Sequence, residues 1–272
     1  MPRYRSHHVA YTPISTMLTT PIKAAAGVAA VLALMATAAC GTSQPPARGT
    51  IGALRDKSAS QVLQVSLAAA RAAGYVKLVE AENDSGNVTM VNGEAGNAAG
   101  TQSFTISGAH AVHFTLSLIG HTVFMKANQA ALGYALGASA ANAHIYANRW
   151  ISVTSKDSGY RRAVENLKIS FQLSTLALNG PLGLQAPTVI RGSSAVGVTG
   201  TVNSHQANVG KLSATLYVST TAPFLPLEMR MHNQSGSVRV EISYSGWGKA
   251  FNLRTPRSAV PLSVVQPSAV NG

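Results

Sequence analysis

The chain has 272 residues and carries 21 Lys and Arg against nine Asp and Glu, a formal net charge of +12 at neutral pH. Its basic residues are scattered singly rather than clustered with aromatic ones, which argues against a nucleic-acid partner and favours an anionic surface or polymer. Cys40 is the only cysteine, so the chain can form neither an intramolecular disulfide nor a multi-cysteine metal site.

The first forty residues have the layout of an export signal. Arg3, Arg5 and Lys23 precede an uncharged apolar run of 16 residues, 24–39. This run is shorter than the roughly 18 residues that a membrane-spanning helix needs, and it ends in small residues, so we expect cleavage of residues 1–39. The polar stretch ahead of the run is unusually long for a leader, which makes Met17 a candidate start.

The segment TAACG at 37–41 resembles the bacterial lipobox, in which the cysteine thiol is diacylated before cleavage. One position departs from that pattern, because a large aliphatic residue is usual where Thr37 stands. The alternative is an ordinary secretory peptide with an unmodified cysteine. The resemblance implies a lipoprotein held by acyl chains, such as palmitate, on Cys40 at the extracytoplasmic face of the cell membrane. Two or three chains anchor a protein stably where one does not.

After cleavage, 233 residues with a formal charge of +9 remain, which suits one large domain. Residues 40–57 combine the lipidated cysteine with prolines and glycines, the composition of a flexible tether. Ser58 and Gln61 have the spacing of a capping box, and apolar residues recur at helical intervals until Gly74. We therefore predict a helix between Ser58 and Gly74.

Beyond Gly74 the apolar period changes to two, which is typical of strands. Residues 75–82 alternate, and residues 110–126 alternate more clearly. The second stretch predicts a hairpin that turns at Gly120 and His121, with a register slip or bulge near the turn. A further short strand is expected at 149–153.

Two segments between these strands favour short helices. Residues 128–136 and 158–178 carry apolar side chains at mostly helical spacings. Asn128 and Ser158 are plausible N-caps, and the Asn-Gly-Pro sequence at 179–181 should close the second segment as a turn.

From residue 188 onward the chain predicts one strand after another. The fold class that follows is α+β: a single antiparallel sheet of roughly ten strands whose apolar face the helices must cover. We assign residues 58–257 to this domain and residues 258–272 to a C-terminal tail. The expected late strands are 188–192, 195–203, 212–219, 225–232, 237–244 and 249–254.

Short motifs along the domain resemble the actinobacterial LppX and LprG lipoproteins, which have a LolA-like fold. The resemblance spans roughly residues 58–256. It implies a curved half-barrel whose concave face, partly roofed by helices, holds acyl chains of lipids or lipoglycans in transit through the envelope. Some relatives with this fold sense or regulate instead. The matching motifs are VFMKA at 123–127, RWISV at 149–153, ATLYV at 214–218, PLE at 226–228, YSGWGK at 244–249 and TP at 255–256.

No catalytic constellation stands out. The nearest approach to a nucleophile elbow, at 192–196, fails at its last position, and no phosphate-binding glycine loop or zinc-protease motif is present. The histidines are dispersed without metal-ligand spacing. We therefore predict no enzyme activity, no cofactor and no metal.

The acidic residues offer two candidate carboxylate pairs. Glu80 and Glu82 share a strand face, and Glu228 and Glu241 are candidate cross-strand neighbours on the solvent side. We interpret both pairs as balancing nearby cations, namely Lys77, Arg230 and Arg239.

Three classes of function remain, in this order: a carrier or binder of amphipathic lipid, a non-catalytic sensor or scaffold that docks an unknown envelope protein, and an unrecognised hydrolase. For the first class, strand parity predicts an apolar cavity between the helices and the sheet, and a register error of one residue would turn a whole strand's set outward. The predicted cavity wall consists of Leu116, Leu118, Val123, Met125, Leu227, Met229, Val240 and Ile242.

Overall fold

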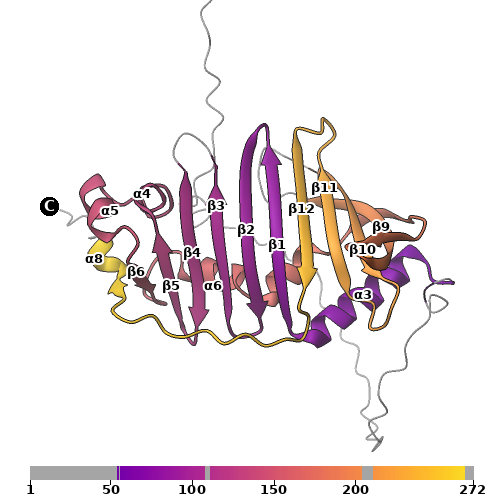
Figure 1. The fold of residues 1–272 in the computed structure, drawn as a ribbon, viewed down its shortest axis with the longest axis horizontal. Helices are drawn as coiled ribbons and strands as arrows, with labels where there is room; N and C mark the ends of the chain where they lie inside the picture. Colours follow the sequence, from indigo (N-terminus) through magenta and orange to yellow (C-terminus); the bar gives the residue numbers. More distant parts are fainter. Residues whose placement is uncertain (1–53, 55, 108–110, 204–210, 267–272) are drawn as a thin grey trace, which may run out of the picture.

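The computed structural model describes residues 54, 56–107, 111–203 and 211–266. The predicted signal segment, Cys40 and most of the predicted tether lie outside these residues. One large, open, curved sheet dominates the described part of the chain, and helices pack on its concave face (Figure 1). The predicted α+β class is confirmed.

The sheet has 13 strands, and all the pairings except that of β13 with β6 are antiparallel. Strands β1–β6 build one side, to which β13 adds an edge strand beside β6, and β7–β12 build the other. They join where β1 pairs with β12 in the middle of the sheet. The strands are β1 (Tyr75–Asp84), β2 (Asn87–Gly96), β3 (Gly100–Ile106), β4 (Val112–Ile119), β5 (Thr122–Ala127), β6 (Trp150–Val153), β7 (Asn179–Leu184), β8 (Thr188–Ile190), β9 (Ser193–Asn203), β10 (Lys211–Ser219), β11 (Pro226–His232), β12 (Val238–Ser245) and β13 (Val260–Pro261).

Helix α3 (Ala59–Ala73) begins and ends where the sequence predicts. The Ser58 hydroxyl accepts from the Gln61 amide, and the Gln61 side chain accepts from the Ser58 amide, so the capping box is complete. Gly74 ends the helix in the left-handed conformation, with a φ of 70°. The apolar stripe of α3 then packs into the core beneath β9–β11.

The other helices are short and lie on the same face of the sheet. Asn128 caps the first of them as predicted, accepting from the Ala131 amide at 2.8 Å. These helices are α4 (Gln129–Leu136), α5 (Ala140–Tyr146), α6 (Tyr160–Asn166), α7 (Ile169–Thr175) and α8 (Leu262–Val265).

Buried apolar side chains form two separate cores. One lies beneath β1, β2 and β9–β12 and includes α3 and α7. The other lies beneath β4–β6 and includes α4, α5 and α8. Phe104 on β3 is partly buried and packs against both cores; its ring stacks on Phe114 with centroids 4.5 Å apart. The middle of the sheet is therefore the boundary between two cores.

The turn between α6 and α7, at Leu167 and Lys168, rests directly on the sheet; we call it the elbow. A Cβ atom at Gly100 on β3 would collide with the Leu167 carbonyl oxygen. Beside this contact, the Gln102 side-chain amide donates to the Asn166 carbonyl at 3.2 Å, and Gln172 donates to the same carbonyl at 3.1 Å. These contacts fix the position of α6 and α7 over β2 and β3.

Three local predictions were wrong. In the hairpin at 110–126, β4 and β5 pair without interruption up to Ile119 and Thr122, so there is no slip near the turn; Gly120, with a φ of 60°, completes a two-residue turn without an extra residue. Residues 158–178 break into two helices because Lys168 is extended, and Gly159 rather than Ser158 occupies the N-cap. Residues 249–254 form no strand.

The strand count also differs from the predicted value. Strands β2, β3, β7 and β13 were not predicted, and β7 includes the residues expected to form a turn at 179–181. Residues 258–272 were assigned to a tail after the domain. The described part of that tail supplies β13, which pairs with β6, and α8, whose Leu262 and Val265 are buried in the second core.

The contact between the elbow and the sheet predicts a specific sensitivity at Gly100. Gly100→Ala should lower the free energy of unfolding by about 2 kcal/mol or more, because the methyl group must displace backbone. Gly133→Ala in α4 is the matched control, since a Cβ there meets nothing within 4 Å. It should be neutral or stabilise by about 0.5–1 kcal/mol. Urea unfolding of both variants measures the difference, and equal effects would contradict the contact.

Candidate functional site

The concave face consists of rows of side chains that face one another across the paired strands. The rows nearest the elbow contain Gly100 and Gln102. The rows farther from the elbow combine apolar side chains with two glutamates, and several of their members are only partly buried. One such row is Phe104, Val91, Glu80, Ile242 and Met229, and the next is Ile106, Thr89, Glu82, Val240 and Met231.

Glu80 lies on the concave face, because it shares its parity on β1 with the buried Leu78. Burial raises its pKa from 4.5 to about 7, and the charge of Glu82 adds to this shift. Lys77, which was expected to balance it, has the opposite parity and therefore points to the other face. None of the ion pairs among the described residues includes Glu80.

Tyr244 on β12 lies diagonally across from Glu80, since Tyr244 pairs with Leu78 and Ile242 pairs with Glu80. Only 5% of Tyr244 is exposed, and its buried hydroxyl has no hydrogen-bond partner. Burial raises its pKa, and so does the nearby Glu80 charge. The Thr175 hydroxyl acts in the opposite sense, but it donates to the Gln172 carbonyl at 2.7 Å and makes no well-formed hydrogen bond to Tyr244.

We call Glu80, Glu82 and Tyr244 the acidic site. It places two carboxylates and a phenol on an otherwise largely apolar part of the concave face. Among the described residues, no group of three or more His, Cys, Asp and Glu could hold a metal ion. The chemistry available at the acidic site is the acceptance of hydrogen bonds and the binding of positive charge.

The predicted cavity wall divides between the two cores. Met229, Val240 and Ile242 are buried in the first core. Leu118, Val123 and Met125 are buried in the second, and Leu116 packs against it. Leu227 stands at a bulge between β10 and β11, partly buried and in neither core. The structure thus does not bring these eight residues together, and a single cavity lined by them stays a prediction.

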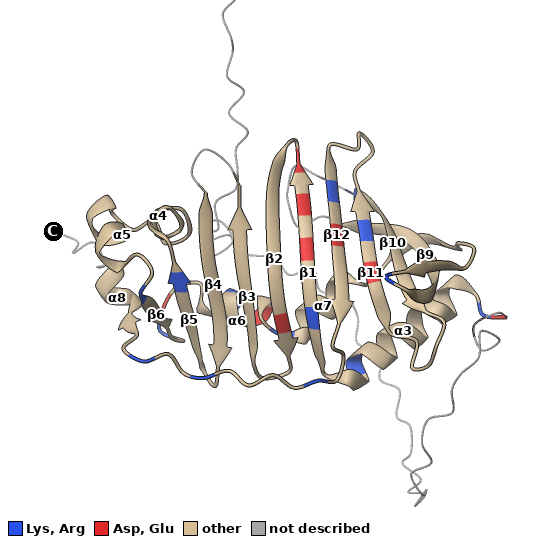
Figure 2. Cartoon of the chain, viewed as in Figure 1, with Lys and Arg blue, Asp and Glu red and all other residues tan. Residues whose placement is uncertain are grey.

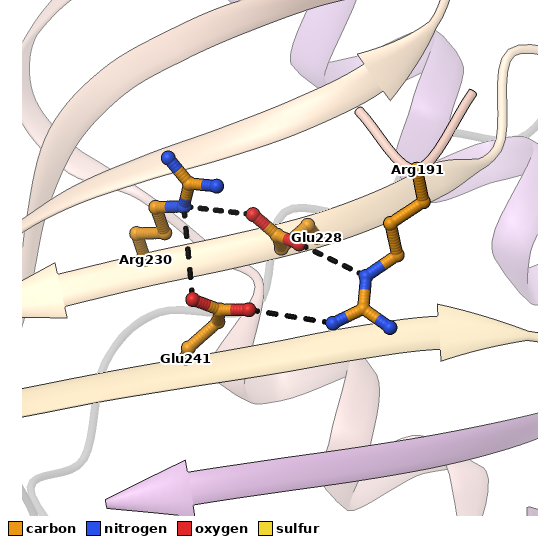
Figure 3. A network of polar contacts seen from close by, with 4 residues as sticks. All are labelled: Arg191, Glu228, Arg230 and Glu241. Atoms are coloured by element: carbon orange, nitrogen blue, oxygen red, sulfur yellow. Dashed lines mark hydrogen bonds and ion pairs between the residues drawn. The ribbon is translucent and has the colours of Figure 1, made fainter. Parts of the chain in front are cut away.

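The convex face carries a different kind of charge cluster (Figure 3). Glu228 on β11 is only 2% exposed, and Arg191 and Arg230 contact its two carboxylate oxygens at 3.1 and 2.7 Å. Both arginines also contact Glu241 on β12, at 3.3 and 3.9 Å. This cluster has two charges of each sign, so its buried carboxylate is compensated.

Figure 2 shows how the charges are distributed along these strands. Several acidic residues follow one another along the upper part of β1, with a basic residue lower on the same strand, and β11 and β12 also carry both signs. The predicted Glu228 and Glu241 neighbours are therefore found on adjacent strands, joined through arginines. Their pairing explains them as structural residues.

A hollow lies between α3 and α7. Its volume is about 310 Å³, and its lining includes Arg71, Asn97 and Leu173. This volume is at the lower limit for small-molecule pockets. The lining combines one cation, one amide, two hydroxyls and aliphatic groups, so this hollow suits a polar group better than a bare acyl chain.

None of the helices in the described segments is both long and apolar enough to cross a membrane.

Among solved structures, the chain is similar to LprF from Mycobacterium bovis, with a TM-score of 0.51, 17% identity, and coverage of 73% of this chain and 96% of that one. The chain has the LolA-like fold of the LppX and LprG type. The likeness at this identity establishes the fold alone. LppX from Mycobacterium tuberculosis is also similar, with a TM-score of 0.46, 16% identity, and coverage of 71% and 96%. No protein-family model and no curated protein matched.

In this LolA-like half-barrel, sequence reasoning identified the apolar parity of the strands but missed the acidic site. Glu80 and Glu82 were recognised as sharing a face, yet they were interpreted only as balancing nearby cations. The signal that could have placed them was present, because Val76 and Leu78 have the same parity on β1 and are buried. Tyr244 was given no role beyond its place in the motif YSGWGK at 244–249.

The raised pKa of Glu80 predicts a pH-dependent stability. Between pH 4.5 and about 7 the folded state holds a proton that the unfolded chain has lost, so stability should fall as pH rises through this window. Glu80→Gln should remove this part of the decline. Thermal unfolding at about pH 5 and pH 8 measures it.

Glu94→Gln is the control for this comparison, since Glu94 lies on the adjacent β2 with the opposite parity. That variant should keep the decline of the unmodified protein. Parallel pH profiles for Glu80→Gln and the unmodified protein would show that Glu80 is not desolvated.

Proposed function

We propose that this protein is a membrane-anchored envelope lipoprotein that binds or carries the acyl chains of a lipid or lipoglycan on the concave face of its half-barrel. One observation carries the proposal. The elbow holds α6 and α7 against the rows at Gly100 and Gln102, while apolar residues farther along the same face, including Ile106 and Met231, stay partly exposed. Apolar surface of this kind on a curved sheet suits an apolar ligand.

Burial of methylene groups supplies the affinity in this proposal. Each methylene moved from water contributes ~0.8 kcal/mol, so about ten of them supply roughly 8 kcal/mol before the entropic cost of association. An acyl chain therefore needs no charged contact to bind. The polar groups of the face remain available to select the head group.

The proposed role requires no catalysis. The convex carboxylate Glu228 is already paired with two arginines, and the acidic site combines no nucleophile with a histidine base among its members. Binding without turnover is the role that these residues support.

The proposed location is the extracytoplasmic face of the cell membrane, with acyl chains on Cys40 as the anchor. The support is the basic leader, the apolar run 24–39 and the small residues before the cysteine. Residues 41–53 provide a tether of Pro, Gly and polar residues between the anchor and Leu54, the first described residue.

Lipid binding predicts that a large side chain on the concave face displaces ligand. Native mass spectrometry of the Cys40→Ala protein should detect copurified lipid, and Met231→Trp should lower the bound fraction severalfold because it fills space beside Val240 and Ala214. Met90→Trp is the matched control, because Met90 has the opposite parity on β2. Absence of lipid from the parent protein would refute the proposed function.

Anchoring predicts a separate result for the cysteine. Cys40→Ala should leave an exported protein that no longer enters the detergent phase on phase separation, because it lacks the acyl chains. Metabolic labelling with a palmitate analogue provides the control, since label should be present on the unmodified protein and absent from the variant. A variant that still partitions with the detergent would mean that Cys40 is not the anchor.

A further inference from the structure

The segment that joins β12 to β13, residues 246–259, carries only positive charge; we call it the strap. It contains three cations, Lys249, Arg254 and Arg257, and no acidic residue. All three side chains are exposed, and none of the ion pairs among the described residues includes them. The strap thus differs from the convex cluster, in which each arginine contacts carboxylates.

The strap is held at both ends along one edge of the sheet, the edge at which β1 and β3 begin; we call this edge the rim. At one end, the Gly248 amide donates to the Tyr75 carbonyl at 3.1 Å, and the Phe251 and Tyr75 rings meet edge to face. At the other end, Val260 pairs with Ile151 on β6. Between these points the strap runs below the ends of β1–β5 in Figure 1, and its cations are spread along it in Figure 2. They form a row along the rim.

The side chains of the strap divide between the protein and the solvent. Phe251 and Leu253 are partly buried, whereas Arg254 is exposed. Helix α3 adds a further exposed cation beside the strap, because Arg71 lies in its last turn and Gly248 lies next to its end. None of the ion pairs in the described part of the chain includes Arg71 either.

Acidic residues near the rim do not offset this row. Glu94 is the cross-strand neighbour of Lys77, a cation that does not belong to the strap. Asp157, in the turn after β6, accepts hydrogen bonds from the Thr154 amide and hydroxyl at 2.7 and 2.9 Å. The rim therefore presents net positive charge to the solvent.

A row of exposed cations along a rim suits an extended anionic surface. The length of the chain ahead of α3 favours a membrane over a free polymer. Residues 41–53 can span about 45 Å when extended, and the 15 residues of α3 are about 22 Å long. The rim beside the end of α3 is therefore within reach of a membrane that holds Cys40, and tethering raises the effective concentration of that membrane at the strap.

We propose that the strap docks on an anionic membrane surface through its three cations. The inference rests on the proposed function, because the acyl chains on Cys40 hold the protein at that membrane. It adds an orientation. The row that contains Ile106 and Met231 lies toward the other end of the strands, roughly 20 Å from the rim, so the partly exposed apolar side chains point away from the membrane.

Sedimentation with vesicles tests the docking in the absence of the anchor. The protein is the mature chain from residue 40 onward with Cys40→Ala, because the apolar run 24–39 would bind vesicles by itself and lies outside the described fold. Vesicles of equal parts phosphatidylglycerol and phosphatidylcholine are compared with pure phosphatidylcholine. Each cation at an anionic surface raises binding about fivefold, so the anionic vesicles should bind about 100-fold more tightly. Salt at about 1 M should remove most of this preference.

Charge removal assigns the binding to the strap. Replacing its three cations together, by Lys249→Gln, Arg254→Gln and Arg257→Gln, should lower binding to the anionic vesicles by about 100-fold. The matched control removes the same charge from exposed cations elsewhere on the sheet and should keep most of the preference; it combines Lys126→Gln, Lys211→Gln and Arg239→Gln. Circular dichroism shows that both variants are folded.

The docking and the proposed function fail in different ways. Equal binding to both kinds of vesicle, or equal losses for the two triple variants, would overturn the docking and leave the proposed function standing. Binding to the soluble polyanion heparin but to neither kind of vesicle would overturn it in favour of a polymer. Failure of the anchor is seen separately, in the phase separation of the Cys40 variant, because the protein used with vesicles carries no acyl chain.

Discussion

The contact between the Leu167 carbonyl and Gly100 is the constraint on which the rest of the concave face depends. Because β3 has no side chain at this point, the elbow between α6 and α7 lies directly on backbone, and Gln102 and Gln172 hold it there through one carbonyl. The helices are thereby fixed over the Gly100 end of the central strands. At the other end of those strands, Ile106 and Met231 stay partly exposed.

The two faces of the sheet hold their carboxylates in different surroundings. Glu228 on the convex face is buried and contacts Arg191 and Arg230. Glu80 on the concave face is partly buried and belongs to none of the ion pairs among the described residues, and its pKa rises to about 7. Stability alone would favour an apolar residue at Glu80, whose neighbours across the strands are Val91 and Ile242.

Sequence patterns predicted the elements whose signals are local. The capping box and Gly74 bounded α3, and strict alternation located β11 and β12. Strands β2 and β3 were not predicted, because Gly93, Gly100 and Gln102 on their concave side interrupt the alternation of apolar and polar residues. Gly100 and Gln102 are the residues that contact the elbow. Residues 249–254 alternate without any strand beside them to pair with. The alternation along each strand also predicted which side chains face the helices. It could not predict which of the two cores each side chain joins, because the positions of the helices decide this.

The central claim is that an acyl chain lies on the part of the concave face where apolar side chains such as Ile106 and Met231 stay partly exposed. A crystal structure with a terminally brominated alkyl chain tests it most directly, since the anomalous signal of bromine locates the chain without ambiguity. The account predicts a bromine site on the concave face, in contact with the rows that contain Ile106, Val240 and Met231. A bromine site in the hollow between α3 and α7, or on the convex face beside Glu228, would contradict it.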